Sequence, residues 1–215
     1  MCFSATASFS AGIALTVVGA MTLSKSRGAN ERLLAAVPLL FAVQQFTEGF
    51  LWVALLQGKS APAQYWLIHS YGVFVGIIWP LMIPAALYLI EPKRIRRRFI
   101  LPILAVGAGV AVYTVRAMIT SEINASIVNH CILYVPSVEP GSLLLISYVI
   151  STSAAFFCSS YRSIHLIGVM NLISFLIAYY YYEINFASGW CFFAAIVSGF
   201  IYLHLSHAKR TASEI

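Results

Sequence analysis

Long apolar segments recur along the chain, and short polar segments separate them. Each is close to the ~20 residues that an α-helix needs to cross about 30 Å of hydrocarbon. The pattern therefore predicts an all-α membrane protein with seven transmembrane helices in a single transmembrane domain, residues 1–215. The seven expected spans are 8–24, 33–56, 65–90, 99–118, 142–160, 163–182 and 188–206, and the one sizeable loop is 119–141.

Composition supports the membrane assignment. Of the 215 residues, 60% are hydrophobic and only 9% are charged, with a mean hydropathy of +0.86, whereas a soluble domain carries about 25% charged residues. The formal net charge of +6 does not indicate nucleic-acid binding, because the basic residues cluster in the loops between spans. The expected partner is the lipid bilayer.

The basic residues also predict the orientation of the helices. Cytoplasmic loops carry an excess of lysine and arginine, and here the loops on one side hold nearly all of them. We therefore expect the N-terminus outside and the C-terminus in the cytoplasm, in a bacterial inner membrane. On the expected inner side are Lys25, Arg27, Arg32, Lys93, Arg94, Arg96, Arg97, Arg98, Arg162, Lys209 and Arg210; on the outer side are Lys59 and Arg116.

The second expected span contains polar side chains at the depth of the membrane. Gln44, Gln45, Glu48 and Trp52 follow one another at helical spacing, so they share a face. An ionisable group inside a membrane is costly and marks a functional site by default. We therefore expect Glu48 to face the interior of the bundle rather than lipid.

Further polar residues fall on the same outer side. Cysteine thiolate, histidine imidazole and glutamate carboxylate are the ligands that zinc prefers, and Cys2, His69, His130 and Glu48 supply them. We predict that these four converge on one zinc site. Gly72 and Gly76 would let a second helix approach His69 closely. The pocket is expected to contain Gln44, Gln45, Trp52, Arg116 and Trp190 as well.

Several functions are compatible with such a pocket. In the first, Glu48 is a catalytic base for a zinc-bound water, and the protein is a membrane-embedded hydrolase or hydratase for a small or lipidic substrate. In the second, the site binds a metal or ligand without turnover, as in a sensor. In the third, Gln44, Gln45 and Glu48 line the path of a small-solute transporter. In a purely structural alternative, Glu48 is a buried residue held in place by its neighbours.

Other classes are excluded by missing residues. All seven acidic residues are glutamates, so an intramembrane aspartyl protease is excluded. No lysine lies inside a span, which excludes a retinal Schiff base. Of the four cysteines, Cys2, Cys131 and Cys191 are expected on the outer, oxidising side. A Cys131–Cys191 disulfide would leave Cys2 as a metal ligand, although spacing alone does not decide the pairing.

Three segments carry a family resemblance. The opening "MCFSATASF", the segment "PLLFAVQQFTEG" and the later "WCFFAAIVS" resemble an uncharacterised bacterial family of seven-helix integral membrane proteins that begin with MCFSA. The likeness extends over nearly the whole chain. It implies a topology and a bacterial source, and it draws attention to Cys2, Glu48, Trp190 and Cys191, but it implies no reaction.

Overall fold

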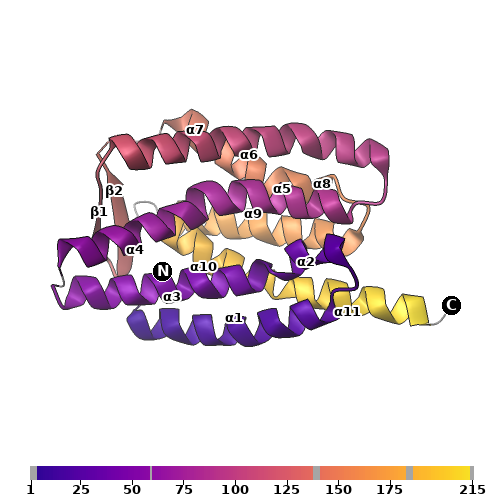
Figure 1. The fold of residues 1–215 in the computed structure, drawn as a ribbon, viewed down its shortest axis with the longest axis horizontal. Helices are drawn as coiled ribbons and strands as arrows, with labels where there is room; N and C mark the ends of the chain where they lie inside the picture. Colours follow the sequence, from indigo (N-terminus) through magenta and orange to yellow (C-terminus); the bar gives the residue numbers. More distant parts are fainter. Residues whose placement is uncertain (1–3, 59, 138–140, 183–185, 214–215) are drawn as a thin grey trace.

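A computed structural model describes residues 4–58, 60–137, 141–182 and 186–213. Figure 1 shows helices that run along one long axis and a small β-hairpin at one end. In chain order the elements are α1 (Ala5–Lys25), α2 (Ala29–Ala35), α3 (Val37–Leu56), α4 (Ala61–Val73), the π-helix η1 (Phe74–Ile78), α5 (Trp79–Ile90), α6 (Arg94–Thr120), β1 (Ile123–Val128), β2 (Cys131–Pro136), α7 (Ser142–Val149), the π-helix η2 (Ile150–Ala154), α8 (Ala155–Phe157), α9 (Arg162–Tyr182), α10 (Phe186–Ser198) and α11 (Phe200–Ser213).

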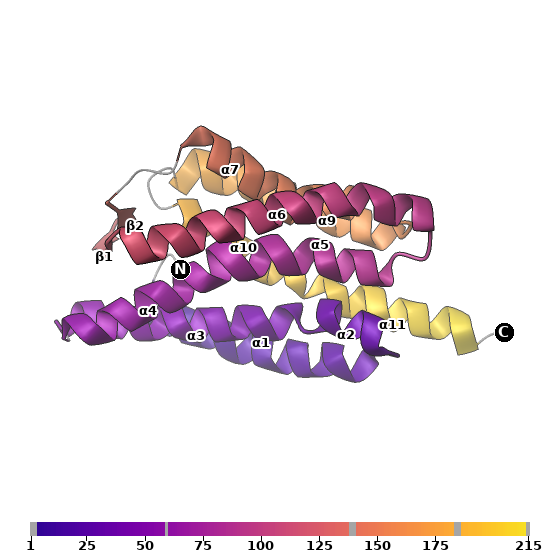
Figure 2. The same ribbon diagram turned by 45° about the horizontal axis from the view of Figure 1, so that its top comes forward.

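The helices connect two ends of the molecule. We call the end with the hairpin 123–136 the hairpin end, and the opposite end, where α6 begins with residues 93–98, the basic end (Figures 1 and 2). The C-terminus lies at the basic end. Because successive helical segments alternate in direction, the chain returns to each end several times, and residues distant in sequence meet there.

Among the described residues, six helical segments are long and apolar enough to cross a membrane, which agrees with a helical, multi-pass membrane protein. A seventh apolar helix, Ser142–Phe157, is shorter. At 1.5 Å per residue it is about 24 Å long, less than the ~30 Å of the hydrocarbon core. The six long segments are Ala5–Lys25, Ala29–Leu56, Ala61–Ile90, Arg94–Thr120, Arg162–Tyr181 and Ser188–Ser206.

Local sequence explains several helix boundaries. The hydroxyl of Ser4 caps α1 by accepting a hydrogen bond from the Ala7 amide at 3.1 Å, as an N-cap serine does. Pro38 and Pro80 lie in the first turns of α3 and α5, where the missing proline N–H costs nothing. The π-helix η1 comes directly before α5, which begins with Trp79 and Pro80.

The close packing of α6 depends on glycine. A Cβ atom added to Gly76 would overlap the side chain of Thr114, and one added to Gly72 would lie 3.3 Å from Met118. The two glycines therefore let α6 approach α4 and η1, as small residues do between membrane helices. The helix that approaches the two glycines is α6, and its contacting residues, Thr114 and Met118, are not expected zinc ligands.

The segment 119–141, expected as a loop, contains the hairpin. Strands β1 and β2 pair antiparallel, with Val128 opposite Cys131, and the two residues between them, Asn129 and His130, both have positive φ. Two such residues make the tight turn that matches the twist of paired strands. The hairpin packs on the bundle through Ile132, which joins a buried cluster with Leu51, Trp52 and Ile68.

Candidate functional site

Glu48 lies in the interior of the bundle. Its side chain is fully buried on α3, which confirms that it does not face lipid. Ser188, at the start of α10, donates a hydrogen bond to Glu48 Oε1 at 3.1 Å. The Tyr134 hydroxyl, from β2, lies close enough to interact electrostatically with the carboxylate. Groups from two distant parts of the chain, α10 and β2, therefore lie beside Glu48.

Two stacked tyrosines cover this carboxylate. The rings of Tyr71 in α4 and Tyr134 in β2 are parallel within 2°, with centroids 4.2 Å apart. Burial raises the pKa of the Tyr134 phenol well above its ordinary value, and the nearby Glu48 raises it further. The phenol therefore stays protonated and can serve as a hydrogen-bond donor. On the other side, Tyr71 donates to the Cys191 sulfur at 3.6 Å.

Gln44 connects the carboxylate region to the centre of the bundle. Its Oε1 accepts a hydrogen bond from the indole nitrogen of Trp79 at 2.7 Å, and its amide also lies beside the Cys191 thiol. The indole of Trp79 stacks on Phe41 with centroids 3.9 Å apart. Gln44 therefore joins α3, α5 and α10 through side-chain contacts.

Gln45 is the polar side chain whose burial is hardest to explain by packing. It is fully buried, and neither its amide nitrogen nor its carbonyl oxygen has a hydrogen-bond partner among the described residues. Leaving a buried amide unpaired costs about 1–3 kcal/mol in proteins. Such a side chain, one helical turn from Glu48, offers one donor group and one acceptor group to a molecule that enters the site.

A small cavity of about 50 Å³ lies at the centre of the bundle, and its lining includes Trp79 and Cys191, the two neighbours of Gln44. Tyr148 and Trp190 meet edge to face, with centroids 5.4 Å apart. The polar side chains at its wall include Asn171, which donates to Ser153 at 2.9 Å. The cavity is lined largely by aromatic and aliphatic residues, among them Phe41, Trp79, Tyr148, Asn171, Trp190 and Cys191.

Four of the predicted pocket residues lie in the interior. Gln44 and Gln45 are fully buried, while Trp52 and Trp190 are 4% exposed. They do not form a single pocket, because Trp52 packs in the cluster under the hairpin whereas Trp190 lines the central cavity. Trp52, at the hairpin end of the polar face of α3, therefore belongs to a different cluster from the residues that line the cavity.

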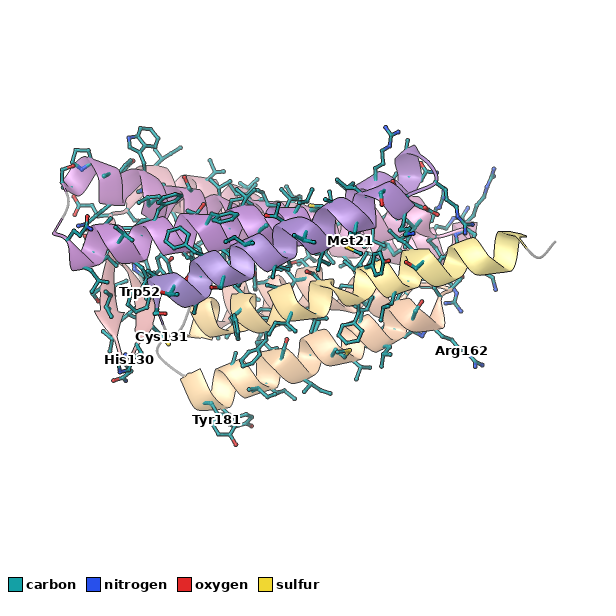
Figure 3. The ribbon with its side chains drawn as sticks, turned by 90° about the horizontal axis from the view of Figure 1, so that it is seen from below. Met21, Trp52, His130, Cys131, Arg162 and Tyr181 are labelled. Carbon is teal, nitrogen blue, oxygen red and sulfur yellow. The ribbon has the colours of Figure 1, made fainter. Side chains whose placement is uncertain are left out.

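The predicted zinc ligands do not gather in the described part of the chain. No group of three histidine, cysteine, aspartate or glutamate side chains there is arranged to hold a metal ion. His130 is exposed at the tip of the hairpin (Figure 3), because the tight turn directs it away from the bundle. Cys2 lies outside the described residues.

His69 has a partner on its own helix, and Arg116 lies at the surface. His69 Nδ1 lies 2.8 Å from the Tyr65 carbonyl, and its ring lies against the Tyr65 ring. Residues two positions apart in an α-helix project about 200° apart, so His69 points away from the face on which Tyr71 meets Cys191. Arg116 is exposed on α6, whereas Glu48 is fully buried, so the expected place of Arg116 in the Glu48 pocket stays a prediction.

The cysteine pairing differs from the one considered above. Cys131 is disulfide-bonded, whereas Cys191 is buried and free. The Cys131–Cys191 pairing is therefore wrong. The physical reason is that the Cys191 sulfur is held inside the bundle by Tyr71, while Cys131 opens strand β2.

Three residues of the site escaped sequence reasoning. Tyr71, Trp79 and Tyr134 supply the contacts that connect Glu48 and Gln44 to the cavity. A signal existed for Tyr134, because two strand-like runs flank the two-residue turn Asn129-His130. Tyr71 and Trp79 are ordinary aromatic residues of an apolar span, and nothing in their local sequence distinguishes them.

The chain was also compared with known proteins. A family model described as a family of unknown function, DUF6629, matches residues 1–214. The chain belongs to DUF6629. No curated protein and no solved structure matches it. Membership of DUF6629 agrees with the resemblance to an uncharacterised family.

Proposed function

We propose that this DUF6629 protein binds a small organic cation, such as methylammonium or guanidinium, in the central cavity beside Glu48, and that it acts as a ligand-binding or sensor membrane protein. The observation that carries the proposal is that Cys191, whose thiol interacts electrostatically with the fully buried Glu48, also lines an aromatic cavity. Gln44 and Cys191 contact the region of Glu48, and Trp79 and Cys191 also line the cavity.

The electrostatic setting favours a positive charge. Charges attract more strongly in the low dielectric of a bundle interior than in water, and Glu48 is fully buried there. Trp79, Tyr148 and Trp190 present rings to the cavity, and a cation over an aromatic face gains further stabilisation.

The size of the cavity limits the ligand. A site for one water needs about 10–15 Å³ measured in this way, so a volume of about 50 Å³ holds a few water-sized groups. Drug-sized ligands occupy pockets of roughly 300–1,000 Å³. The cavity therefore favours a solute of about four non-hydrogen atoms or fewer, within the size of methylammonium and guanidinium.

Tryptophan fluorescence tests this proposal. In a Trp52→Phe/Trp66→Phe background, the remaining tryptophans are Trp79 and Trp190, both at the cavity. Titration with methylammonium chloride should change the emission saturably, and sodium chloride at equal ionic strength should not. Filling the cavity with Ala194→Leu should abolish the response. A linear change, or the same response after Ala194→Leu, would overturn the proposal.

Ala105→Leu is the matched control for cavity filling. Ala194 lines the cavity, whereas Ala105 is exposed on α6, so the same three-carbon enlargement there should leave the response intact. Size-exclusion profiles of both variants separate loss of binding from loss of fold. A folded Ala194→Leu protein without a response supports the cavity as the site.

A zinc-dependent hydrolase or hydratase with Cys2, His69, His130 and Glu48 stays a prediction, as does a small-solute transporter. Elemental analysis of the purified protein, wild type against His69→Ala, tests the first. Stoichiometric zinc that the substitution removes would favour it. Uptake of methylammonium into proteoliposomes tests the second.

The topology is likewise proposed. We infer seven crossings, with the N-terminus outside and the C-terminus in the cytoplasm of a bacterial inner membrane. The helix Ser142–Phe157 supports the seventh crossing because it links the hairpin end to the basic end (Figure 1). A periplasm-dependent reporter fused after Ile215 should be inactive, and activity there would contradict this orientation.

A further inference from the structure

The basic end contains a rigid junction between two turns of the chain. Glu91, just after α5, is fully buried. Its carboxylate accepts hydrogen bonds from the Ser160 amide at 2.6 Å, the Ser160 hydroxyl at 2.5 Å and the Lys93 amide at 3.1 Å. The turn before α6 is therefore tied to the turn before α9.

Two arginines are fixed against this junction by neutral acceptors. Arg96 donates to the Ser159 carbonyl, and Arg97 donates to the Glu91 carbonyl at 2.6 Å while lying over the Tyr88 ring at 5.4 Å. A carbonyl oxygen orients a guanidinium without neutralising it. Each guanidinium has five N–H donors, so both keep donors for a further partner.

These arginines belong to a larger surface with a strong excess of positive charge. The single carboxylate of the junction, Glu91, is buried beneath it, so it offers no exposed counter-charge. Arg162 projects from the end of the molecule in Figure 3. We call this group the arginine surface; it consists of Lys93, Arg94, Arg96, Arg97, Arg98 and Arg162.

Apolar side chains adjoin the arginine surface. Arg94 and Arg98 are exposed and lie one helical turn apart on α6. Ile95 and Phe99, each next in sequence, are 57% and 61% exposed. At the start of α6, exposed cations therefore lie beside exposed apolar side chains. This arrangement suits a ligand with an anionic head and hydrocarbon tails. A free phosphate would use only the cations.

We propose that the arginine surface is a binding site for an anionic phospholipid, whose phosphate contacts the arginines and whose acyl chains contact Ile95 and Phe99. Clusters of lysine and arginine at the cytoplasmic ends of membrane helices bind anionic lipids in this way. The α6 N-terminus adds to the attraction, because backbone N–H groups at a helix start favour negative charge. The site is independent of the Glu48 cavity.

Retention of phosphatidylglycerol tests the proposal. The full-length protein is purified from nanodiscs of phosphatidylglycerol and phosphatidylcholine into detergent, and retained lipid is counted by native mass spectrometry. The wild type should retain phosphatidylglycerol in preference to phosphatidylcholine. Arg94→Gln/Arg98→Gln/Arg162→Gln should weaken the apparent affinity for phosphatidylglycerol by at least about tenfold.

Lys25→Gln/Arg27→Gln/Arg32→Gln is the matched control, because it removes three charges from the same end, in and around the α1–α2 turn. It should leave retention within about threefold of the wild type. Equal losses in the two triple variants would overturn the proposal, since they would show general surface attraction. Displacement of the lipid by millimolar inorganic phosphate would overturn it too, because the acyl contacts would then contribute nothing.

Discussion

The ring of Tyr134 on the β-hairpin lies parallel to the ring of Tyr71 in α4, with centroids 4.2 Å apart and an interplanar angle of 2°. This contact joins the hairpin to a membrane helix directly beside the buried carboxylate of Glu48. The hairpin is therefore a structural cover of the site rather than a detached loop. Access to the carboxylate from the hairpin end depends on how firmly this cover is held.

Removing the stack should loosen the hairpin. An aromatic pair contributes about 0.5–1.5 kcal/mol beyond its buried area. Tyr134→Ala should therefore increase the rate of amide hydrogen exchange across β1 and β2 by about 2- to 12-fold. Tyr134→Phe keeps the ring and should exchange nearly as slowly as the wild type. Equal exchange in the Ala variant and the wild type would mean that the stack does not hold the hairpin.

The Trp79–Gln44 hydrogen bond should behave as a coupled buried pair. Trp79→Phe leaves the Gln44 oxygen without its donor, and Gln44→Leu leaves the indole N–H without its acceptor. Each single change should cost about 1–3 kcal/mol, whereas the double variant should cost less than the sum. Thermal unfolding in detergent measures all three variants. Strict additivity would contradict a direct energetic link between these side chains.

Helix approach at Gly76 should tolerate no side chain. A methyl group there would overlap Thr114 on α6, and overpacking costs about 1–3 kcal/mol. Gly76→Ala should therefore lower the unfolding temperature. Gly109→Ala is the matched control, because a Cβ at Gly109 meets no atom within 4 Å. If both substitutions have the same effect, helix propensity rather than packing determines the result.

The free energy of unfolding should depend on pH because of the Glu91 carboxylate. Burial alone raises the pKa of Glu91, but hydrogen bonds from Ser160 and the Lys93 amide, with nearby Arg96, lower it below its ordinary value of 4.5. A lowered pKa in the folded state gives stability that is fully present above the unfolded-state pKa and is lost as the pH falls through the folded-state pKa.

Comparing Glu91→Gln with the wild type measures this contribution. The variant should be less stable at pH 7, and the difference should shrink as the pH is lowered below about 4.5. Glu122→Gln, at an exposed position near the hairpin, should show no such convergence. A constant difference from pH 7 to pH 3 would mean that the charge of Glu91 does not stabilise the junction.

Sequence patterns were sufficient for the class of fold and for the burial of Glu48. Continuous apolar runs predict helices wherever they are long enough, and the spacing of Gln44, Gln45 and Glu48 indicates one polar face. The span predicted at 142–160 is a shorter helix, Ser142–Phe157. Its length was overestimated because the apolar pattern continues into the turn that follows the helix.

The site was less predictable because it depends on contacts between distant segments. Glu48 meets Ser188 across 140 positions, and Tyr71 meets Cys191 across 120. Depth in the membrane does not determine which face of a helix a side chain occupies, and the contacts of His69 are with Tyr65 on its own helix. His130 was misplaced because a tight turn, rather than an extended loop, carries it.

Equilibrium binding of radiolabelled methylammonium to the purified protein measures whether the cavity holds an organic cation. The wild type and Glu122→Gln should bind saturably with about one site per chain, and guanidinium should compete. Glu48→Gln, with folding verified by its size-exclusion profile and unfolding transition, should weaken binding by at least about tenfold, because it removes the buried carboxylate. Absence of saturable binding to the wild type, or equal affinity in Glu48→Gln, would contradict the account.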